Sequence, residues 1–284
     1  MRDLALLIKF RLSITVVISA AAGYLLAVDS VAWMDFTYLM LGGILIVGAS
    51  NAFNQIWEIE RDAKMERTKN RPLPSGRMAK DRAFTWAILF AVLGSYALYS
   101  LNVETMAWGL LSMILYVFAY TPMKAKTPWA VFVGAFPGAI PFMLGWVAAT
   151  GQFGIEPGIL FAIQFFWQFP HFWAIGWLSY DDYALAGYNL LPSRRKDSSA
   201  TYLSLTYSVM MVFLSLWPAF GQSGALQLST TAAIIVGLLG LDLLRLAIAH
   251  HRKQSDATAR ALMFGTIRYL PLLQIVYVID HFLS

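Results

Sequence analysis

The sequence predicts an all-α, polytopic membrane protein. Only 13% of its 284 residues are charged and 58% are hydrophobic, whereas a globular domain carries about 25% charged residues. Nine apolar stretches follow one another along the chain, each about 16 to 22 residues long and therefore able to cross a bilayer as a helix. The cations lie within alternate connections between these stretches or a few residues from their ends. These three observations predict a single transmembrane domain over residues 1–284.

The first predicted span begins close to the N-terminus. Lys9 and Arg11 interrupt the apolar start, so we expect a retained span rather than a signal peptide. The fourth stretch is the shortest and is rich in Tyr toward its end. The nine spans lie near residues 12–28, 37–57, 83–101, 106–121, 129–149, 157–178, 203–220, 229–248 and 266–283.

The distribution of charge predicts the orientation. Cations precede the first span and fill cap loops near 58–82, 122–128, 179–201 and 249–265, whereas the other connections contain acids but no Lys or Arg. By the positive-inside rule, the cation-bearing loops are cytoplasmic. We therefore expect an integral protein of the bacterial cytoplasmic (inner) membrane, with its N-terminus in the cytoplasm and its C-terminus outside.

Composition also excludes several classes of protein. The net charge of +5 follows from the topology, so we expect no nucleic-acid partner. The chain has no cysteine, which excludes a disulfide scaffold, thiolate catalysis and a cysteine-ligated metal.

A polar face runs through the end of the second span. If the helix continues at 100° per residue, five polar side chains share an arc of about 100°. They are Asn51, Asn54, Gln55, Glu58 and Asp62, and bases follow them as far as Arg77. Carboxylates and a carboxamide one turn apart suit a divalent cation that holds a phosphate ester. The alternative is a solvated helix end with surface ion pairs, which we disfavour because polar side chains within a membrane usually line a cavity.

A second polar face is expected on the sixth span. Gln164, Gln168, His171 and Asp182 return to similar angles on a continuous helix, and His171 lies about 16 Å deeper than Asp182 at 1.5 Å per residue. A lone buried His is as compatible with hydrogen-bonded packing as with a ligand or base. Lys124, after the fourth span, is either an anion contact or a lysine that sets the topology.

Other groups have a structural interpretation. Gly134, Gly138 and Gly145 of the fifth span are expected to allow close helix packing. We assign the Asp242–Arg245 pair, together with the basic end after it, to packing and topology.

The motifs taken together resemble one known family. Asn54-x-x-x-Glu58-x-x-x-Asp62, followed by MERTKNRPL, resembles the first aspartate-rich motif of the UbiA-type intramembrane prenyltransferases. YTPMK, GAFPGAIP, WQFPHFWA, DDYALAG and LLP resemble the protoheme IX farnesyltransferase (haem O synthase) branch. The recognisable blocks run from Lys9 to Pro192, and the similarity is weak beyond about residue 200.

The resemblance implies a fold, a reaction and a set of residues. It implies nine helices around a central cavity, and transfer of farnesyl from farnesyl diphosphate to a vinyl group of haem B with water added, giving haem O and pyrophosphate. With Mg²⁺ as cofactor, the catalytic and metal-binding residues are Asn54, Glu58, Asp62 and Asp182. Asp181 belongs to the second motif of the family, and we expect it to bind substrate together with Arg67, Arg71, Tyr120, Lys124, Gln168 and His171. Two departures are notable: Glu58 replaces the usual Asp, and the second motif is DDY rather than a spaced DxxxD.

Other functions compete with this one. A prenyltransferase of the same fold acting on a quinone precursor such as 4-hydroxybenzoate is the main alternative. A transporter is disfavoured because the ionisable residues gather at one face and no internal repeat is evident. A respiratory assembly subunit would not need the ordered polar faces on the second and sixth spans. The sequence leaves open the oligomeric state, the number of metal ions, the haem orientation, whether His171 ligates iron, and any haem-handling or oxidase-assembly partner.

Overall fold

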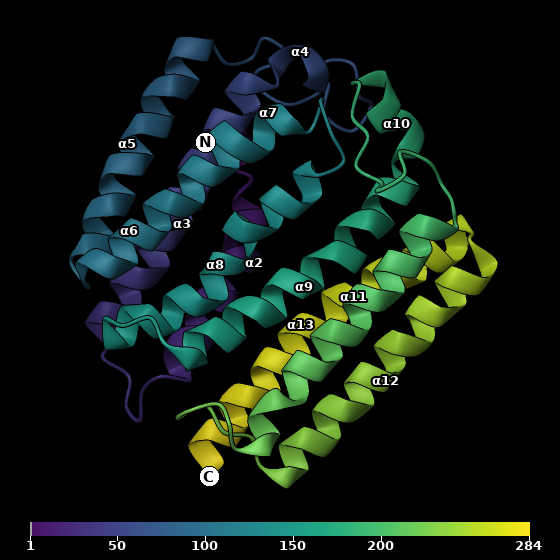
Figure 1. Cartoon of the computed structure of the whole chain (residues 1–284). Helices are drawn as coiled ribbons and strands as arrows, with labels where there is room; N and C mark the ends of the chain where they lie inside the picture. The colour runs from purple at the N-terminus through teal and green to yellow at the C-terminus, as the bar shows by residue number, and fades with distance from the viewer. Residues whose placement is uncertain (1) are drawn as a thin grey trace.

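The computed structural model describes residues 2–284, and over these residues it contains helices and no strand, which confirms the predicted all-α class (Figure 1). The long helices are α2 (Phe10–Leu25), α3 (Trp33–Trp57), α5 (Lys80–Tyr99), α6 (Val103–Ile114), α8 (Ala130–Thr150), α9 (Ile155–Leu178), α11 (Ser198–Leu216), α12 (Thr230–Lys253) and α13 (Asp256–Leu283). The short ones are α1 (Arg2–Leu7), α4 (Ile59–Asp62), a π-helix (Leu115–Tyr120), α7 (Thr121–Met123), α10 (Tyr180–Leu185) and a 3₁₀ helix (Trp217–Phe220).

Each predicted span lies on a helical segment, but the number of membrane crossings stays a prediction. Within residues 2–284, seven helical segments are long and apolar enough to cross a bilayer. Helix α2 is apolar but has only 16 residues. Helix α9 has 24 residues and is not among the seven. The segments as a group make this an integral membrane protein.

Helix α8 packs in the interior of the bundle, against α2, α6 and α9. A Cβ on Gly145 would lie 1.9 Å from the Ala20 carbonyl oxygen of α2, and one on Gly23 would lie 2.0 Å from the Phe142 carbonyl oxygen. Because no side chain larger than hydrogen fits at either position, α2 and α8 touch backbone to backbone. The predicted packing role of the glycine-rich fifth span is therefore confirmed.

The prolines of α8 also have a structural consequence. Pro141 has no N–H, so the carbonyl of Pro137 loses its helical donor. The Ser112 hydroxyl of α6 donates a hydrogen bond to this oxygen at 3.1 Å. The polar side chain thus satisfies a backbone group that would otherwise be unpaired within the membrane.

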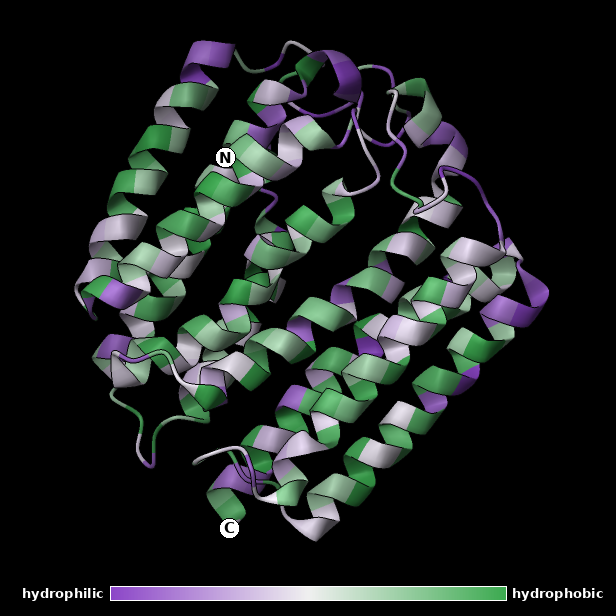
Figure 2. Ribbon diagram, in the orientation of Figure 1, coloured by the Kyte–Doolittle hydropathy of each residue, from purple (hydrophilic) through white to green (hydrophobic). Residues whose placement is uncertain are grey.

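The polar cap lies at one end of the bundle. Helices α4, α7 and α10 gather there with the N-terminus, and the C-terminus lies at the opposite end (Figure 1). Figure 2 shows hydrophilic residues gathered over this end, whereas the helices below it are mainly hydrophobic. The loops that carry the two acidic motifs therefore come together, although about 120 residues separate them.

Candidate active site

The first acidic motif spans a break between two helices. Helix α3 ends at Trp57, and Glu58 leaves the helical region with φ −106° and ψ 12° before α4 begins. The prediction of one continuous helix through Asp62 is therefore wrong. The one-turn spacing survives because the Asp62 N–H donates to the Glu58 carbonyl at 2.7 Å. Asn54, Glu58 and Asp62 are 1%, 3% and 1% exposed.

Glu58 is the most densely contacted carboxylate in this cluster. The Lys124 ammonium lies 2.6 Å from its Oε1 atom, and the Tyr188 hydroxyl donates to the same atom at 2.7 Å. The Asn54 amide donates to the other oxygen, Oε2, at 2.9 Å and also to the Thr121 hydroxyl at 3.0 Å. One buried carboxylate is thus held by groups from three separate segments.

The charges of this cluster alter one another's protonation. Burial raises the pKa of the Glu58 carboxyl, but the Lys124 ammonium and the hydrogen bonds from Lys124 and Tyr188 lower it by more, so the pKa lies below its ordinary value. Burial lowers the pKa of Lys124, and Glu58 partly offsets that effect. Burial, with the nearby cations Arg71 and Lys124, lowers the pKa of Lys9 to about 7. An anion bound here would relieve the repulsion among these cations.

Asp62 forms a second buried ion pair beside the first. Arg71 donates to Asp62 Oδ2 at 2.7 Å, and the Asp62 side chain is only 1% exposed. The Thr68 hydroxyl donates to the Asp62 carbonyl at 2.8 Å, which folds the loop after α4 back over the site. Lys9 donates to the Asn54 side-chain oxygen at 3.4 Å. Three cations therefore face the buried acids from the start of α2, the loop after α4 and the loop after α7.

The second acidic motif supports the first rather than joining its ion pairs. Asp182 accepts a hydrogen bond from the Glu66 backbone N–H at 2.9 Å. The Arg67 guanidinium donates a hydrogen bond to the hydroxyl of Tyr183, the residue after Asp182, at 3.3 Å, and it lies 5.5 Å from the centre of the Tyr183 ring. Asp181 is exposed. These contacts tie α10 to the loop that carries Arg71.

The polar side chains expected on the sixth span contact two different neighbouring helices, α8 and α13. Gln164 and Gln168 donate to carbonyl oxygens of α8, at Gly138 and Ala135, each at 2.8 Å. His171 instead bonds the Thr266 hydroxyl of α13 at 2.9 Å and stacks on Trp167.

Gln164, Gln168 and His171 all lie within the continuous helix α9, but the predicted extension of their face to Asp182 is wrong, because the helix breaks at Ser179 (φ −101°, ψ 18°) before Asp182. Tyr120, by contrast, lies beneath Lys124, with the ammonium 5.0 Å from its ring.

The buried acids have the chemistry of a magnesium site, although residues 2–284 contain no cluster of three or more His, Asp or Glu side chains arranged to hold a metal ion. Mg²⁺ prefers oxygen ligands and is usually held by one or two carboxylates together with substrate phosphates and water. Glu58, Asp62 and the Asn54 side-chain oxygen supply such a set. Two carboxylates are therefore enough for an ion that enters with a diphosphate.

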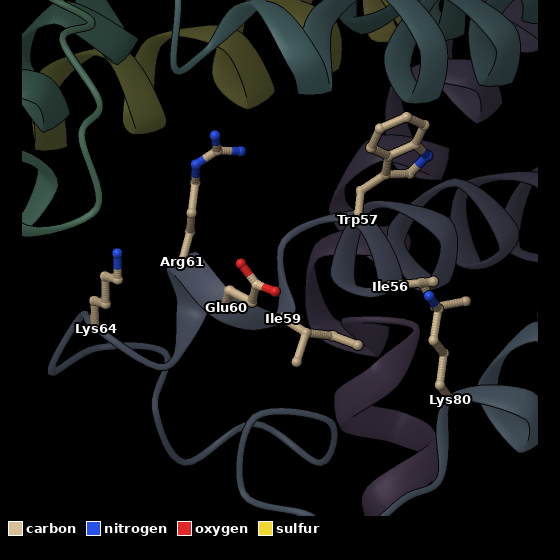
Figure 3. A pocket seen from close by; sticks show the side chains of 7 residues that line it. All are labelled: Ile56, Trp57, Ile59, Glu60, Arg61, Lys64 and Lys80. Carbon is tan, nitrogen blue, oxygen red and sulfur yellow. The ribbon is translucent and has the colours of Figure 1, made fainter.

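Two cavities lie beside this cluster. The outer cavity, of about 400 Å³, is bordered by Trp57, Glu60, Arg61, Lys64 and Lys80, among others. Figure 3 shows Trp57 and Arg61 extending in the same direction from the end of α3 and from α4. The other, of about 200 Å³, shares Trp57 and Arg61 and reaches Glu58. Glu60 lies in the outer cavity and is exposed, so it is separate from the buried acids.

Sequence reasoning missed three residues of the site. Tyr188 follows the DDYALAG motif directly, and Thr121 lies within YTPMK, yet neither has a spacing that predicts contact with the first motif. Lys9 was interpreted only as a topology signal. All three contacts cross between segments far apart in the sequence, so only the folded structure reveals them.

Comparison with known proteins identifies the family of this chain. The model of the UbiA prenyltransferase family matches residues 16–267. This chain belongs to the UbiA prenyltransferase family. The match confirms the resemblance inferred from the two acidic motifs.

Curated relatives within the family share one name. A protoheme IX farnesyltransferase of Christiangramia forsetii is 53% identical over 97% of this chain and 92% of its own length. One of Flavobacterium johnsoniae is 49% identical, covering 97% and 93%. A mitochondrial protoheme IX farnesyltransferase of Arabidopsis thaliana is 35% identical and covers 93% of this chain and 61% of its own.

Solved structures agree on the fold. A structure described as giving insight into digeranylgeranylglyceryl phosphate synthase in membranes superimposes with a TM-score of 0.83 at 16% identity, covering 100% of this chain and 99% of the other. A UbiA homolog from Archaeoglobus fulgidus bound to DMAPP and Mg²⁺ gives 0.78 at 13% identity, covering 99% and 98%. At these identities the likeness supports the fold alone.

Proposed function

We propose that this chain is a protoheme IX farnesyltransferase, which transfers the farnesyl group of farnesyl diphosphate to a vinyl group of haem B. The observation that carries the proposal is the buried pair of acids, Glu58 and Asp62, faced by Lys9, Arg71 and Lys124 at one end of an apolar bundle. The names of relatives at 49–53% identity support this acceptor.

The reaction places two demands on the protein. When the allylic C–O bond breaks, its electron pair leaves with pyrophosphate and a farnesyl cation remains. The vinyl π electrons then form the new C–C bond; water adds to the resulting cation and a proton is lost, which gives the hydroxyl of haem O. The site must therefore stabilise a departing anion and keep water from the farnesyl cation until the vinyl group attacks.

The cap residues meet the first demand. Lys9, Arg71 and Lys124 converge on the acids from three segments, and a bound diphosphate would draw these cations toward its oxygens. Arg67, at the edge of the cap, is suited to the same role. Asn54, Glu58 and Asp62 would hold Mg²⁺, with Asp182 orienting the loop above them. When bound, the ion would neutralise part of the charge on the leaving pyrophosphate.

The interior of the bundle meets the second demand. Farnesyl and porphyrin groups are both apolar and partition into a bilayer, so the substrates would enter from the membrane side of the cap. Trp167 stacks on His171 at a centroid distance of 4.7 Å, and aromatic faces stabilise a nearby cation. We assign His171 to the haem side, as a hydrogen-bonding group or iron ligand, with Gln168 and Tyr120 lining the route between cap and acceptor.

The orientation follows from the charge distribution. The cation-bearing loops would face the cytoplasm and the C-terminus would lie outside, in the bacterial inner membrane. The diphosphate end of farnesyl diphosphate is anionic and water-soluble, so a cytoplasmic cap would receive that end at the membrane surface while the farnesyl group stays in the bilayer.

An acceptor comparison tests the proposal. Purified protein in lipid vesicles is supplied with Mg²⁺, farnesyl diphosphate and either haem B or 4-hydroxybenzoate, and pyrophosphate release is measured. We expect release with haem B above the level without acceptor. Release with 4-hydroxybenzoate but not with haem B would show that haem B is not the acceptor, while leaving the prenyltransferase chemistry intact.

A further inference from the structure

Three charged side chains lie on the outer surface of α12 and α13, far from the candidate active site. Arg245 and Arg268 each approach a different oxygen of Asp242 at 2.7 Å. The side chains of Asp242, Arg245 and Arg268, which we call the charged triad, are 41%, 70% and 60% exposed. The predicted Asp242–Arg245 pair is thus present, but it belongs to a larger and more exposed group than the sequence indicated.

Asp242 and Arg268 lie near the midpoints of α12 and α13, although the predicted span 266–283 places Arg268 close to the membrane edge. Asp242 is 12 residues from the start of α12 and 11 from its end, or about 16–18 Å from each at 1.5 Å per residue. Arg268 is likewise 12 residues, about 18 Å, from the start of α13. A helix that is centred in a hydrocarbon core about 30 Å thick holds its midpoint far from both lipid head-group layers.

Lipid does not satisfy such a group. Charged side chains within a membrane almost always face a bundle interior or a water-filled cavity, where they are paired. Here two cations share one carboxylate, so the triad has one uncompensated positive charge. The exposed neighbours Leu238, Leu241 and Phe264 are apolar and need only lipid, but the residual charge needs an anion at the same depth.

A glycine on the same face permits close approach. Gly237 is on the row of α12 that continues through Leu241 to Arg245, at steps of four residues. A Cβ at Gly237 would meet no atom within 4 Å, so packing within the chain does not require glycine there. Glycine at exposed positions of transmembrane helices allows another helix to approach closely.

We propose that the α12–α13 face binds a transmembrane helix of another protein, which carries one carboxylate near its midpoint. That carboxylate would pair with Arg245 and Arg268 and balance the charged triad. Gly237 would accept the partner's backbone about two turns away. Soluble proteins and lipid phosphates do not reach this depth, which leaves an intramembrane helix as the matching partner.

Synthetic helices test the proposal on the full chain. Because the sequence has no cysteine, Ser284→Cys supplies one dye site, and the labelled protein is placed in phosphatidylcholine vesicles. Acceptor-labelled Leu/Ala helices with Glu, Gln or Leu at the centre are added, and energy transfer gives the affinity. We expect the Glu helix to bind at least tenfold more tightly than the Leu helix.

Variants separate charge from folding. Arg268→Leu leaves a neutral Asp242–Arg245 pair and should abolish the preference for the Glu helix, whereas Arg268→Lys should retain it. Gly237→Val should weaken binding of the Glu helix several-fold. Arg260→Leu, on the same helix but near its end, is the matched control and should have no effect. All variants should retain wild-type pyrophosphate release, because none lies at the cap.

Three outcomes would overturn the proposal. The first is equal affinity for the Glu and Leu helices, or an unchanged preference in Arg268→Leu. The second is energy transfer between differently labelled copies of the chain that Arg268→Leu abolishes, because the face would then bind a second copy. The third is loss of the Glu preference when phosphatidylglycerol replaces phosphatidylcholine, because an anionic lipid would then occupy the site.

Discussion

Replacement of Tyr188 by Phe tests whether the loop after α10 contributes to metal binding by the first acidic motif. The Tyr188 hydroxyl donates to Glu58 Oε1 at 2.7 Å, and both residues are buried. A hydrogen bond to a charged group contributes about 1.5–3 kcal/mol, and we expect the lower end because Lys124 stays on the same oxygen. The phenyl ring keeps the packing and the cation–π contact with Lys124, so the substitution removes only the hydroxyl.

The expected effect is on metal affinity. Loss of a group that orients a metal ligand costs about 10–100-fold in affinity or activity, so Tyr188→Phe should raise the Mg²⁺ concentration needed for half-maximal pyrophosphate release by at least about tenfold. Tyr183→Phe is the matched control, because its hydroxyl contacts only the exposed Arg67, and it should change little. A Tyr188→Phe protein whose Mg²⁺ dependence stays within about twofold of wild type would refute the reasoning.

Three further predictions follow from the contacts of the fold and site. Arg71→Met leaves its buried carboxylate partner uncompensated and should cost about 3–5 kcal/mol of unfolding free energy, measured by denaturation in detergent; Lys69→Met, which breaks an exposed pair, should cost under about 1 kcal/mol, and equal losses would contradict the difference in burial. Gly145→Ala forces a methyl group into the α2 backbone and should lower stability by about 1–3 kcal/mol, whereas Gly158→Ala meets only a distant ring atom; an unchanged melting temperature for Gly145→Ala would exclude the close contact. His171→Ala should abolish haem O formation but leave farnesyl diphosphate binding intact, and unchanged turnover would exclude a role at the acceptor.

The fold class was predictable because a bilayer restricts the solutions available to a chain. Within lipid, backbone polar groups must be bonded inside the segment, so long apolar runs had to be helices, and each predicted span lies on one. Helix ends were less predictable. The breaks at Glu58 and Ser179 lie at the polar cap, where water and side chains satisfy backbone groups and the helical period no longer holds.

The site was predictable only where its residues are close together in the sequence. Asn54, Glu58 and Asp62 share a face because their spacing is local. The contacts of Lys9 and Tyr188 depend on how distant loops meet over the cap, and no local pattern specifies that. His171 shows the opposite error, because an angular position on α9 did not reveal that α13 lies on that side with Thr266 as a partner.

Mass spectrometry of the haem product tests the central claim most directly. Haems are extracted after the protein in vesicles has been incubated with haem B, farnesyl diphosphate and Mg²⁺, beside a sample treated with a chelator and a Glu58→Gln variant. The account predicts a haem enlarged by one farnesyl group and one hydroxyl group in the complete reaction, and strongly reduced product in both controls. Folded protein that forms no farnesylated haem, or forms it equally well with chelator present, would contradict the account.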